Sequence, residues 1–100
     1  MLTGKQKSFL RSEAHHLQPI FQVGKGGVNQ AMIKQIEEAL EARELLKVSI
    51  LQNNDDDKKE VATALAEGTG ADLVQLIGST IVLYKESVNN KKIILPKAKA

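Results

Sequence analysis

Hydrophobic residues follow two different patterns along the chain, one typical of helices and one typical of strands. Apolar residues recur every three or four positions, as in helices that pack on one side, in residues 4–17, in residues 30–43, and between the run Asp55–Asp57 and Gly68. Short apolar runs that are typical of strands lie at 20–23, 47–51, 73–77 and 80–84. The predicted order of elements is therefore α-β-α-β-α-β-β.

Residue types at the borders of these segments support the assignment. Thr3 and Gln6 fit a capping box before the first helix, and Asn29 is a good N-cap for the second. Pro19 disfavours helix at the residue before it, so the first helix ends there. The pair Gly78-Ser79 between two apolar runs indicates a two-residue hairpin turn.

This order of elements also predicts the sheet. Two successive βαβ units imply parallel strands with right-handed crossovers, and the hairpin adds an antiparallel strand. We predict a two-layer α/β domain with a four-stranded mixed sheet. We expect a single domain over residues 1–96, followed by a polar tail over residues 97–100.

Composition narrows the possible functions. A chain of 100 residues can bury a modest core without the help of disulfides or metal ions. It has no cysteine, which excludes disulfides, thiolate metal sites and catalytic thiols. No apolar run approaches the roughly 18 residues that a membrane span requires. We expect a cytoplasmic protein with no membrane partner.

Charge is unevenly distributed along the chain. Residues 1–35 carry five Lys or Arg and one acid, residues 36–72 carry four and ten, and residues 73–100 carry five and one. The three balances are +4, −6 and +4, which sum to the net charge of +2. Such a molecule could present one basic face to a polyanion, although scattered surface charge would give the same balance.

The stretch IFQVGKGGVNQ places three glycines and a lysine between a strand and a helix. It is not a dinucleotide fingerprint, which would need glycine at Asn29, and it lacks the GxxxxGK order of a P-loop. What remains is strand–GxxG–helix, with Gly24 and Gly27 as the fixed positions. Such a loop can be a simple turn, or it can bring phosphates to backbone N–H groups, as in KH-type modules. Lys25 and the following helix N-terminus would add positive charge.

Basic residues are expected to gather near this loop. Because only Gln18 and Pro19 separate the first helix from the first strand, we expect the two to pack antiparallel. Lys5 and Lys7 would then lie at the loop end of the sheet, with Arg11 one turn further down the helix. Lys34 would stand on the exposed side of the second helix.

Other candidate groups have simpler interpretations. His15 and His16 point about 100° apart on a helix, so they do not readily chelate one ion, although His15 could contact RNA. Asp55–Asp57 lacks the spacing of a calcium loop and suits the start of a helix. We expect this acidic run at the same end of the sheet as the glycine loop. There it either points away from the loop or limits non-specific binding of RNA. We find no nucleophile–base pair and no metal cluster, and therefore expect neither an enzyme nor a cofactor. The three aromatic residues are too few for base stacking across the sheet.

A set of spaced residues resembles the CRM domain (chloroplast RNA splicing and ribosome maturation), and in particular its stand-alone bacterial YhbY-like members. The similarity covers roughly residues 2–96. The matching residues are Arg11, Ala14-His15, Leu17, Pro19, Gly24-Lys25, Gly27, Glu41-Ala42-Arg43-Glu44-Leu45, Lys47-Val48, Val82-Leu83-Tyr84 and Leu95-Pro96.

The resemblance implies an RNA-binding domain folded like the C-terminal domain of translation initiation factor three. For stand-alone bacterial members it also implies association with precursor large ribosomal subunits. We therefore expect a non-catalytic, monomeric protein that binds ribosomal RNA and has no small-molecule substrate. A protein-interaction adaptor on the same scaffold is the alternative. The expected RNA-binding residues are Gly24, Lys25, Gly26, Gly27, Lys5, Lys7, Arg11, Lys34 and His15.

Overall fold

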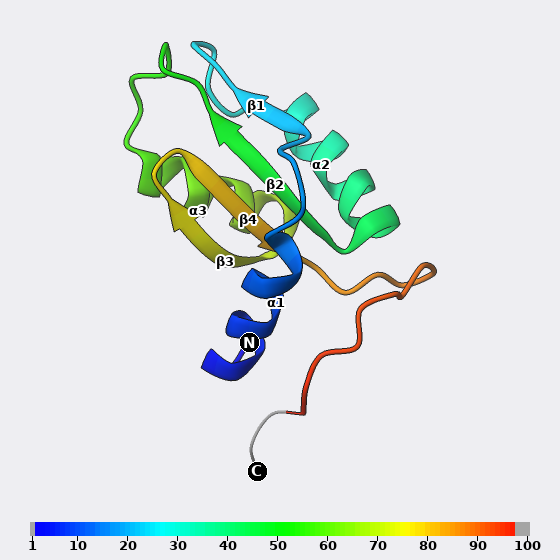
Figure 1. The fold of residues 1–100 in the computed structure, drawn as a ribbon. Helices are drawn as coiled ribbons and strands as arrows, with labels where there is room; N and C mark the ends of the chain where they lie inside the picture. Colours follow the sequence, from blue (N-terminus) through cyan, green and yellow to red (C-terminus); the bar gives the residue numbers. More distant parts are fainter. Residues whose placement is uncertain (1, 98–100) are drawn as a thin grey trace.

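The computed structural model describes residues 2–97 and contains the predicted order of elements (Figure 1). The helices are α1 (Gly4–Ala14), α2 (Gln30–Arg43) and α3 (Lys58–Thr69). The strands are β1 (Phe21–Val23), β2 (Leu45–Ile50), β3 (Asp72–Ile77) and β4 (Thr80–Tyr84). Apart from Lys97, the predicted polar tail lies outside the described residues.

The four strands form one mixed sheet in the order β1-β2-β4-β3. β1 and β2 are parallel, whereas β4 runs antiparallel to both of its neighbours. β2 and β3 therefore point the same way, but β4 lies between them. The Gly78-Ser79 turn joins β3 to β4 as predicted, with Gly78 at a φ of 57°. The α/β class and the mixed four-stranded sheet are confirmed.

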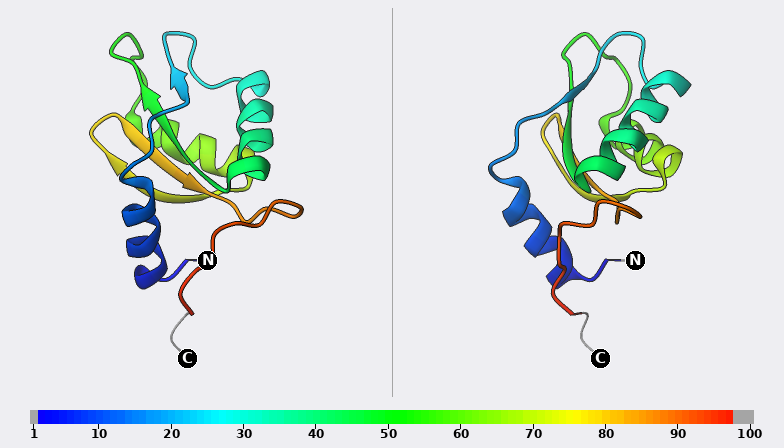
Figure 2. Two further views of the ribbon diagram at one scale, coloured as in Figure 1. Left: turned by 45° about the vertical axis from the view of Figure 1, so that its right-hand side comes forward. Right: turned by 90° about the vertical axis from the view of Figure 1, so that its right-hand side faces the viewer.

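The main hydrophobic core lies between the sheet and the helices α2 and α3, which cover the same face (Figure 2). Alternate residues of β2, namely Leu46, Val48 and Ile50, point into this core. From α2 and α3 the core takes apolar residues at helical spacing: Ile33, Ile36, Leu40, Val61, Ala62, Leu65 and Ala66. These helices and the sheet are the two layers that the sequence predicts.

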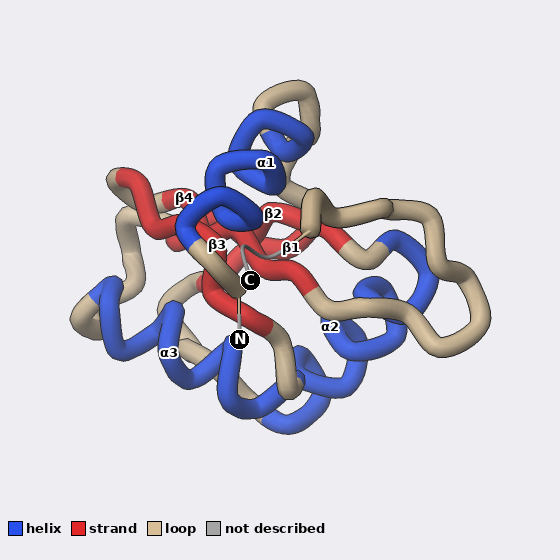
Figure 3. Tube along the Cα trace, turned by 90° about the horizontal axis from the view of Figure 1, so that it is seen from below, coloured by secondary structure: helices blue, strands red, loops and turns tan. Residues whose placement is uncertain are grey.

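Helix α1 adds a partial third layer on the opposite face (Figure 3). Leu10 and Ala14 pack against a second apolar cluster formed by Leu45, Val74, Val82 and Tyr84 of the sheet. This cover extends over only part of the face. The remaining part carries polar side chains, such as those of Lys47 and Thr80, because the same strands alternate there between core and solvent.

The predicted orientation of the first helix is wrong. α1 packs mainly on β2, β3 and β4 rather than antiparallel to β1. It ends at Ala14, three residues earlier than predicted, so a longer connection over residues 15–20 leads to β1 without reversing the chain (Figure 1). The apolar second face, which needs cover, determines where α1 lies.

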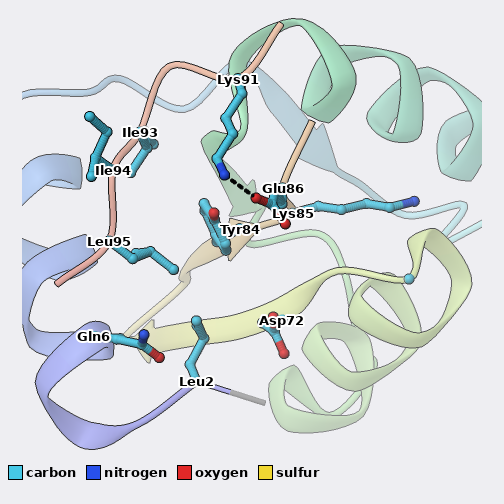
Figure 4. A pocket seen from close by; sticks show the side chains of 11 residues that line it. Leu2, Gln6, Asp72, Tyr84, Lys85, Glu86, Lys91, Ile93, Ile94 and Leu95 are labelled. Atoms are coloured by element: carbon cyan, nitrogen blue, oxygen red, sulfur yellow. Dashed lines mark ion pairs between the residues drawn. The ribbon is translucent and has the colours of Figure 1, made fainter. Parts of the chain in front are cut away.

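As a consequence, Lys5 and Lys7 lie at the end of the sheet opposite to the glycine loop. The neighbouring residue Gln6 donates a hydrogen bond from Nε2 to the carbonyl of Pro96, at 3.0 Å. It also lines a hollow of about 590 Å³ beside Tyr84, the last residue of β4 (Figure 4). The glycine loop follows β1 at the other end, where β4 begins.

Two glutamates at the end of α2 hold the segment that follows β4. Glu44 is fully buried and has a φ of 67°, and its carboxylate accepts backbone N–H bonds from Ser87, Lys92 and Ile93 at 2.8, 2.6 and 2.7 Å. Burial raises the pKa of this carboxyl, but the three N–H bonds outweigh burial, so the pKa lies below its usual value. The sequence analysis did not foresee this role.

Glu41 holds the same segment one turn earlier. Its carboxylate accepts the N–H groups of Val88 and Asn89 at 3.0 and 2.9 Å, and the hydroxyl of Ser87 at 2.7 Å. These bonds lower the pKa of Glu41 from 4.5 to about 2. We call residues 85–97 the C-terminal segment.

Candidate nucleic-acid interface

The glycine loop is a tight turn at the end of β1. The N–H of Gly27 donates to the carbonyl of Gly24 at 3.0 Å, which places Lys25 and Gly26 at the exposed tip. Within residues 2–97, neither Lys25 nor Gly26 has a hydrogen-bond partner for its backbone N–H. The tip therefore presents two free donors and one ammonium group.

The glycines of this loop have different structural requirements. Gly27 has a φ of 72°, a left-handed conformation, and a Cβ there would lie 3.1 Å from Oδ2 of Asp56. A Cβ on Gly26 would meet nothing within 4 Å. Gly27 thus shapes the turn, whereas Gly26 leaves the tip open for the close approach of a ligand.

Helix α2 begins just beyond the loop. Asn29 is its N-cap as predicted, and its Oδ1 accepts the N–H of Met32 at 2.9 Å. The partial positive charge of a helix N-terminus favours anions. The loop and the helix start together form a surface that suits a phosphate group.

The loop that follows β2, residues 51–57, lies directly beside the glycine loop (Figure 1). Asn54 donates from Nδ2 to the carbonyl of Gly24 at 2.8 Å. The prediction that the acidic run lies at this end of the sheet is confirmed, and Asp56 faces Gly27. Asp57 occupies the N-cap position of α3 but makes no side-chain capping bond.

The uncovered part of the second sheet face adjoins this end. A shallow hollow of about 260 Å³ lies there between the second half of α1 and the strands. Arg11 and His15 border it from the helix, and Lys47 borders it from β2. The Nζ of Lys47 donates to the carbonyl of Leu17 at 3.1 Å, which fixes this side chain against the connection that follows α1.

Lys7, Arg11 and His15 follow each other at four-residue spacing and so lie along one flank of α1. Together with Lys47 they form what we call the basic ridge. The sequence analysis missed Lys47. The alternation of side chains along a strand could have indicated it, because Lys47 points away from the core if the adjacent Val48 points into it.

The remaining predicted residues lie elsewhere. Lys5 stands on a different side of α1 from Lys7, because residues two positions apart on a helix point about 200° apart. Lys34 lies on α2, in the helical layer behind the sheet, beside Glu37 and Glu38. The structure therefore brings Arg11 and His15 next to Lys47, and it places Lys5 and Lys34 on other sides of the molecule.

Three further observations bear on metal binding and membrane insertion. The rings of His15 and His16 meet edge to face with centroids 5.4 Å apart. Across residues 2–97, no three His, Cys, Asp or Glu side chains gather as metal ligands would. In the same part of the chain, none of the helices has the length and apolar character needed to cross a membrane.

The fold and this loop define a small α/β domain with a strand–GxxG–helix element. The sequence profile of the CRS1 / YhbY (CRM) domain matches residues 2–85, and the chain belongs to this family. The family predicted from the spaced residues is confirmed.

Several known proteins are similar over nearly the whole chain. "Probable RNA-binding protein YqeI" of Bacillus subtilis is 73% identical over 96 residues, which are 96% of this chain and 100% of that protein. An "RNA-binding protein" of Haemophilus influenzae is 38% identical, over 96% of both chains. The solution structure of SAV1595 from Staphylococcus aureus, described as a candidate RNA binding protein, has 64% identity and a TM-score of 0.80, covering 96% of this chain and 100% of that one.

Proposed function

We propose that this chain is a non-catalytic RNA-binding protein. It binds ribosomal RNA in precursor large ribosomal subunits during their assembly, and it acts as a monomer in the cytoplasm. Membership of the CRM family and the names of its relatives support RNA as the ligand. The ribosomal assignment rests on the resemblance to stand-alone bacterial YhbY-like members.

The observation that carries the proposal is the exposed tip of the glycine loop. Lys25 and Gly26 offer free N–H groups, and no side chain at Gly26 hinders the approach of a phosphate. The N-terminus of α2 lies behind the tip and adds partial positive charge. These contacts read the nucleic-acid backbone rather than base identity.

The basic ridge extends the proposed interface beyond the loop. Arg11 can form bidentate bonds to a phosphate, and Lys47 adds a point charge on the sheet. His15 lies on the same flank and can donate a hydrogen bond to RNA. Arg11, His15 and Lys47 border the uncovered part of the second sheet face, so a structured RNA bound to the glycine loop could extend over this face. Lys5 and Lys34 are not part of this interface.

Co-sedimentation with ribosomal particles tests this function directly. The tagged full chain should sediment with precursor large subunits and should be released by ribonuclease. Lys25→Glu/Gly26→Glu should abolish the association and leave the melting temperature nearly unchanged, because the tip is exposed. Lys59→Glu/Thr63→Glu, an equal charge change on the exposed side of α3, is the matched control and should sediment like the wild type.

Two results would contradict the proposal. Sedimentation that survives complete digestion of the RNA would indicate binding to a ribosomal protein, which is the adaptor function. Equal loss in both double variants would show that net charge, and not the loop, determines binding.

A further inference from the structure

We propose that Asn54 is a positioning residue of the RNA site, which holds the glycine loop in its binding conformation from the neighbouring loop. This inference rests on the proposed function and adds a residue to it. Asn54 lies thirty positions from Gly24 in sequence. It carries no charge and is half-buried, so it has no evident place in a phosphate-binding surface.

The carbonyl of Gly24 is the point at which the two loops meet. It accepts the N–H of Gly27 at 3.0 Å, which closes the turn, and the Nδ2 of Asn54 at 2.8 Å. A carbonyl oxygen has two lone pairs, so these two bonds saturate it. The orientation of the peptide unit between Gly24 and Lys25 is thereby fixed.

That orientation determines where a donor of the tip points. In a trans peptide the C=O and the following N–H point in opposite directions, and residues 2–97 contain no cis peptide bond. If Asn54 holds the carbonyl of Gly24 toward its own loop, the N–H of Lys25 must face away from that loop. The hydrogen bond from Asn54 thus aims a free donor at the side where a phosphate can approach.

The amide of Asn54 is itself held by Asp56. Its Oδ1 accepts the backbone N–H of Asp56 at 3.0 Å, and its Nδ2 also lies 3.2 Å from Oδ2 of Asp56. Both ends of the amide therefore have partners, which leaves a single favourable orientation. Glycine-rich turns are flexible in isolation, so support from outside the turn reduces the entropy lost on binding.

The test uses Asn54→Ser in the full chain. A serine hydroxyl can still accept the N–H of residue 56, so the loop keeps its own turn, but it cannot reach Gly24 to donate. Gln52→Ser is the matched control, because Gln52 is an exposed amide in the same loop. Amide hydrogen exchange of Gly27 in the free protein, and titration with a ribosomal RNA fragment at several salt concentrations, are measured for both variants and for Lys25→Glu/Gly26→Glu.

We expect Asn54→Ser to speed exchange at Gly27 in the free protein and to weaken RNA binding about fivefold, the effect of one neutral hydrogen bond. The salt dependence should stay unchanged, because no cation is lost. Gln52→Ser should match the wild type in every measurement.

Three results would overturn the inference. RNA binding by Asn54→Ser within twofold of Gln52→Ser, while the double acidic variant fails to bind, would refute it and leave the proposed function intact. Weaker binding with unchanged exchange at Gly27 would mean that Asn54 contacts RNA itself. Wild-type binding by the double acidic variant would refute the proposed site and this inference with it.

Discussion

The two ends of the sheet hold irregular backbone in opposite ways. At one end, Glu41 and Glu44 bind five backbone N–H groups of the C-terminal segment. At the other end, Asn54 binds a carbonyl of the glycine loop and leaves the N–H groups of Lys25 and Gly26 without partners. Both ends use side chains from a neighbouring element to fix a segment without regular structure.

The difference separates a structural role from a binding role. Carboxylates that accept N–H groups satisfy the donors of the C-terminal segment within the protein itself. The Asn54 amide binds the carbonyl of Gly24 but neither N–H group of the tip, so it fixes the glycine loop and leaves the donors of the loop available to an external anion. The same contrast predicts that changes at the first end affect stability and that changes at the second affect binding.

The largest expected effect is on stability, from Glu44→Gln. The amide retains one acceptor oxygen but places an NH₂ group against backbone donors in a fully buried site. We expect the free energy of unfolding to fall by about 3 kcal/mol, because hydrogen bonds to charged groups are the stronger ones. Urea denaturation measures the loss, with the exposed Glu38→Gln on the same helix as control. An equal loss in both variants would mean that the buried carboxylate has no special role.

Acid should reduce the stability that Glu41 and Glu44 contribute at this end of the sheet. The pKa of Glu41 falls from 4.5 to about 2 on folding, and the pKa of Glu44 is also lowered. A lowered pKa contributes stability that is present above the unfolded value of 4.5 and is lost as the pH falls toward 2. Melting temperatures measured across this window should decrease, and the decrease should be smaller in Glu41→Gln. An identical pH dependence in wild type and variant would contradict the role given to the Glu41 carboxylate.

The basic ridge should matter more for binding than for stability. Arg11→Gln/Lys47→Gln should reduce RNA affinity by roughly tenfold and make the log–log salt slope shallower by about 1.4, since two phosphate contacts disappear. Lys5→Gln/Lys34→Gln removes the same charge from residues outside the interface and should leave the slope nearly unchanged. Fluorescence titration of labelled RNA distinguishes the pairs. If the two double variants bind RNA alike, affinity depends only on the net charge of the protein and not on the position of the charges.

The smallest effect concerns the acids beside the glycine loop. Asp55→Asn/Asp56→Asn/Asp57→Asn removes three charges from the loop beside the glycine loop, where Asp56 faces Gly27, and keeps the residue type that caps helices well. Affinity for unrelated RNA should rise a few-fold, most at low salt, where screening is weak. Stability should fall slightly, because α3 loses acids at its N-terminus. Unchanged binding at low salt would show that these acids serve only to start the helix.

Local signals predicted most of the fold. Helical and strand periods located all seven elements, and the capping box of Thr3 and Gln6 is formed as the sequence indicated. The position of α1 could not be predicted in this way. It depends on which residues of β2, β3 and β4 are apolar on the second face, and that is known only when the strand order is known.

The candidate site could be predicted only where its signal is local in the sequence. The spacing of Gly24 and Gly27 marks the loop locally, whereas the bond from Asn54 to Gly24 joins residues far apart in sequence. Glu41 and Glu44 bind a segment without periodic pattern, so no sequence signal paired them with it. Lys47 joins the basic ridge only because α1 ends beside β2.

Salt dependence of RNA binding tests the central claim most directly. If Lys7, Arg11, Lys25 and Lys47 all approach phosphates, the log of the binding constant should fall with the log of salt concentration at a slope of about −3, from roughly −0.7 per contact with single-stranded RNA. The measurement is a titration of a ribosomal RNA fragment with the full chain at several salt concentrations. A slope near −3 agrees with the account. A slope near zero would mean that binding depends on apolar contacts, and would contradict it.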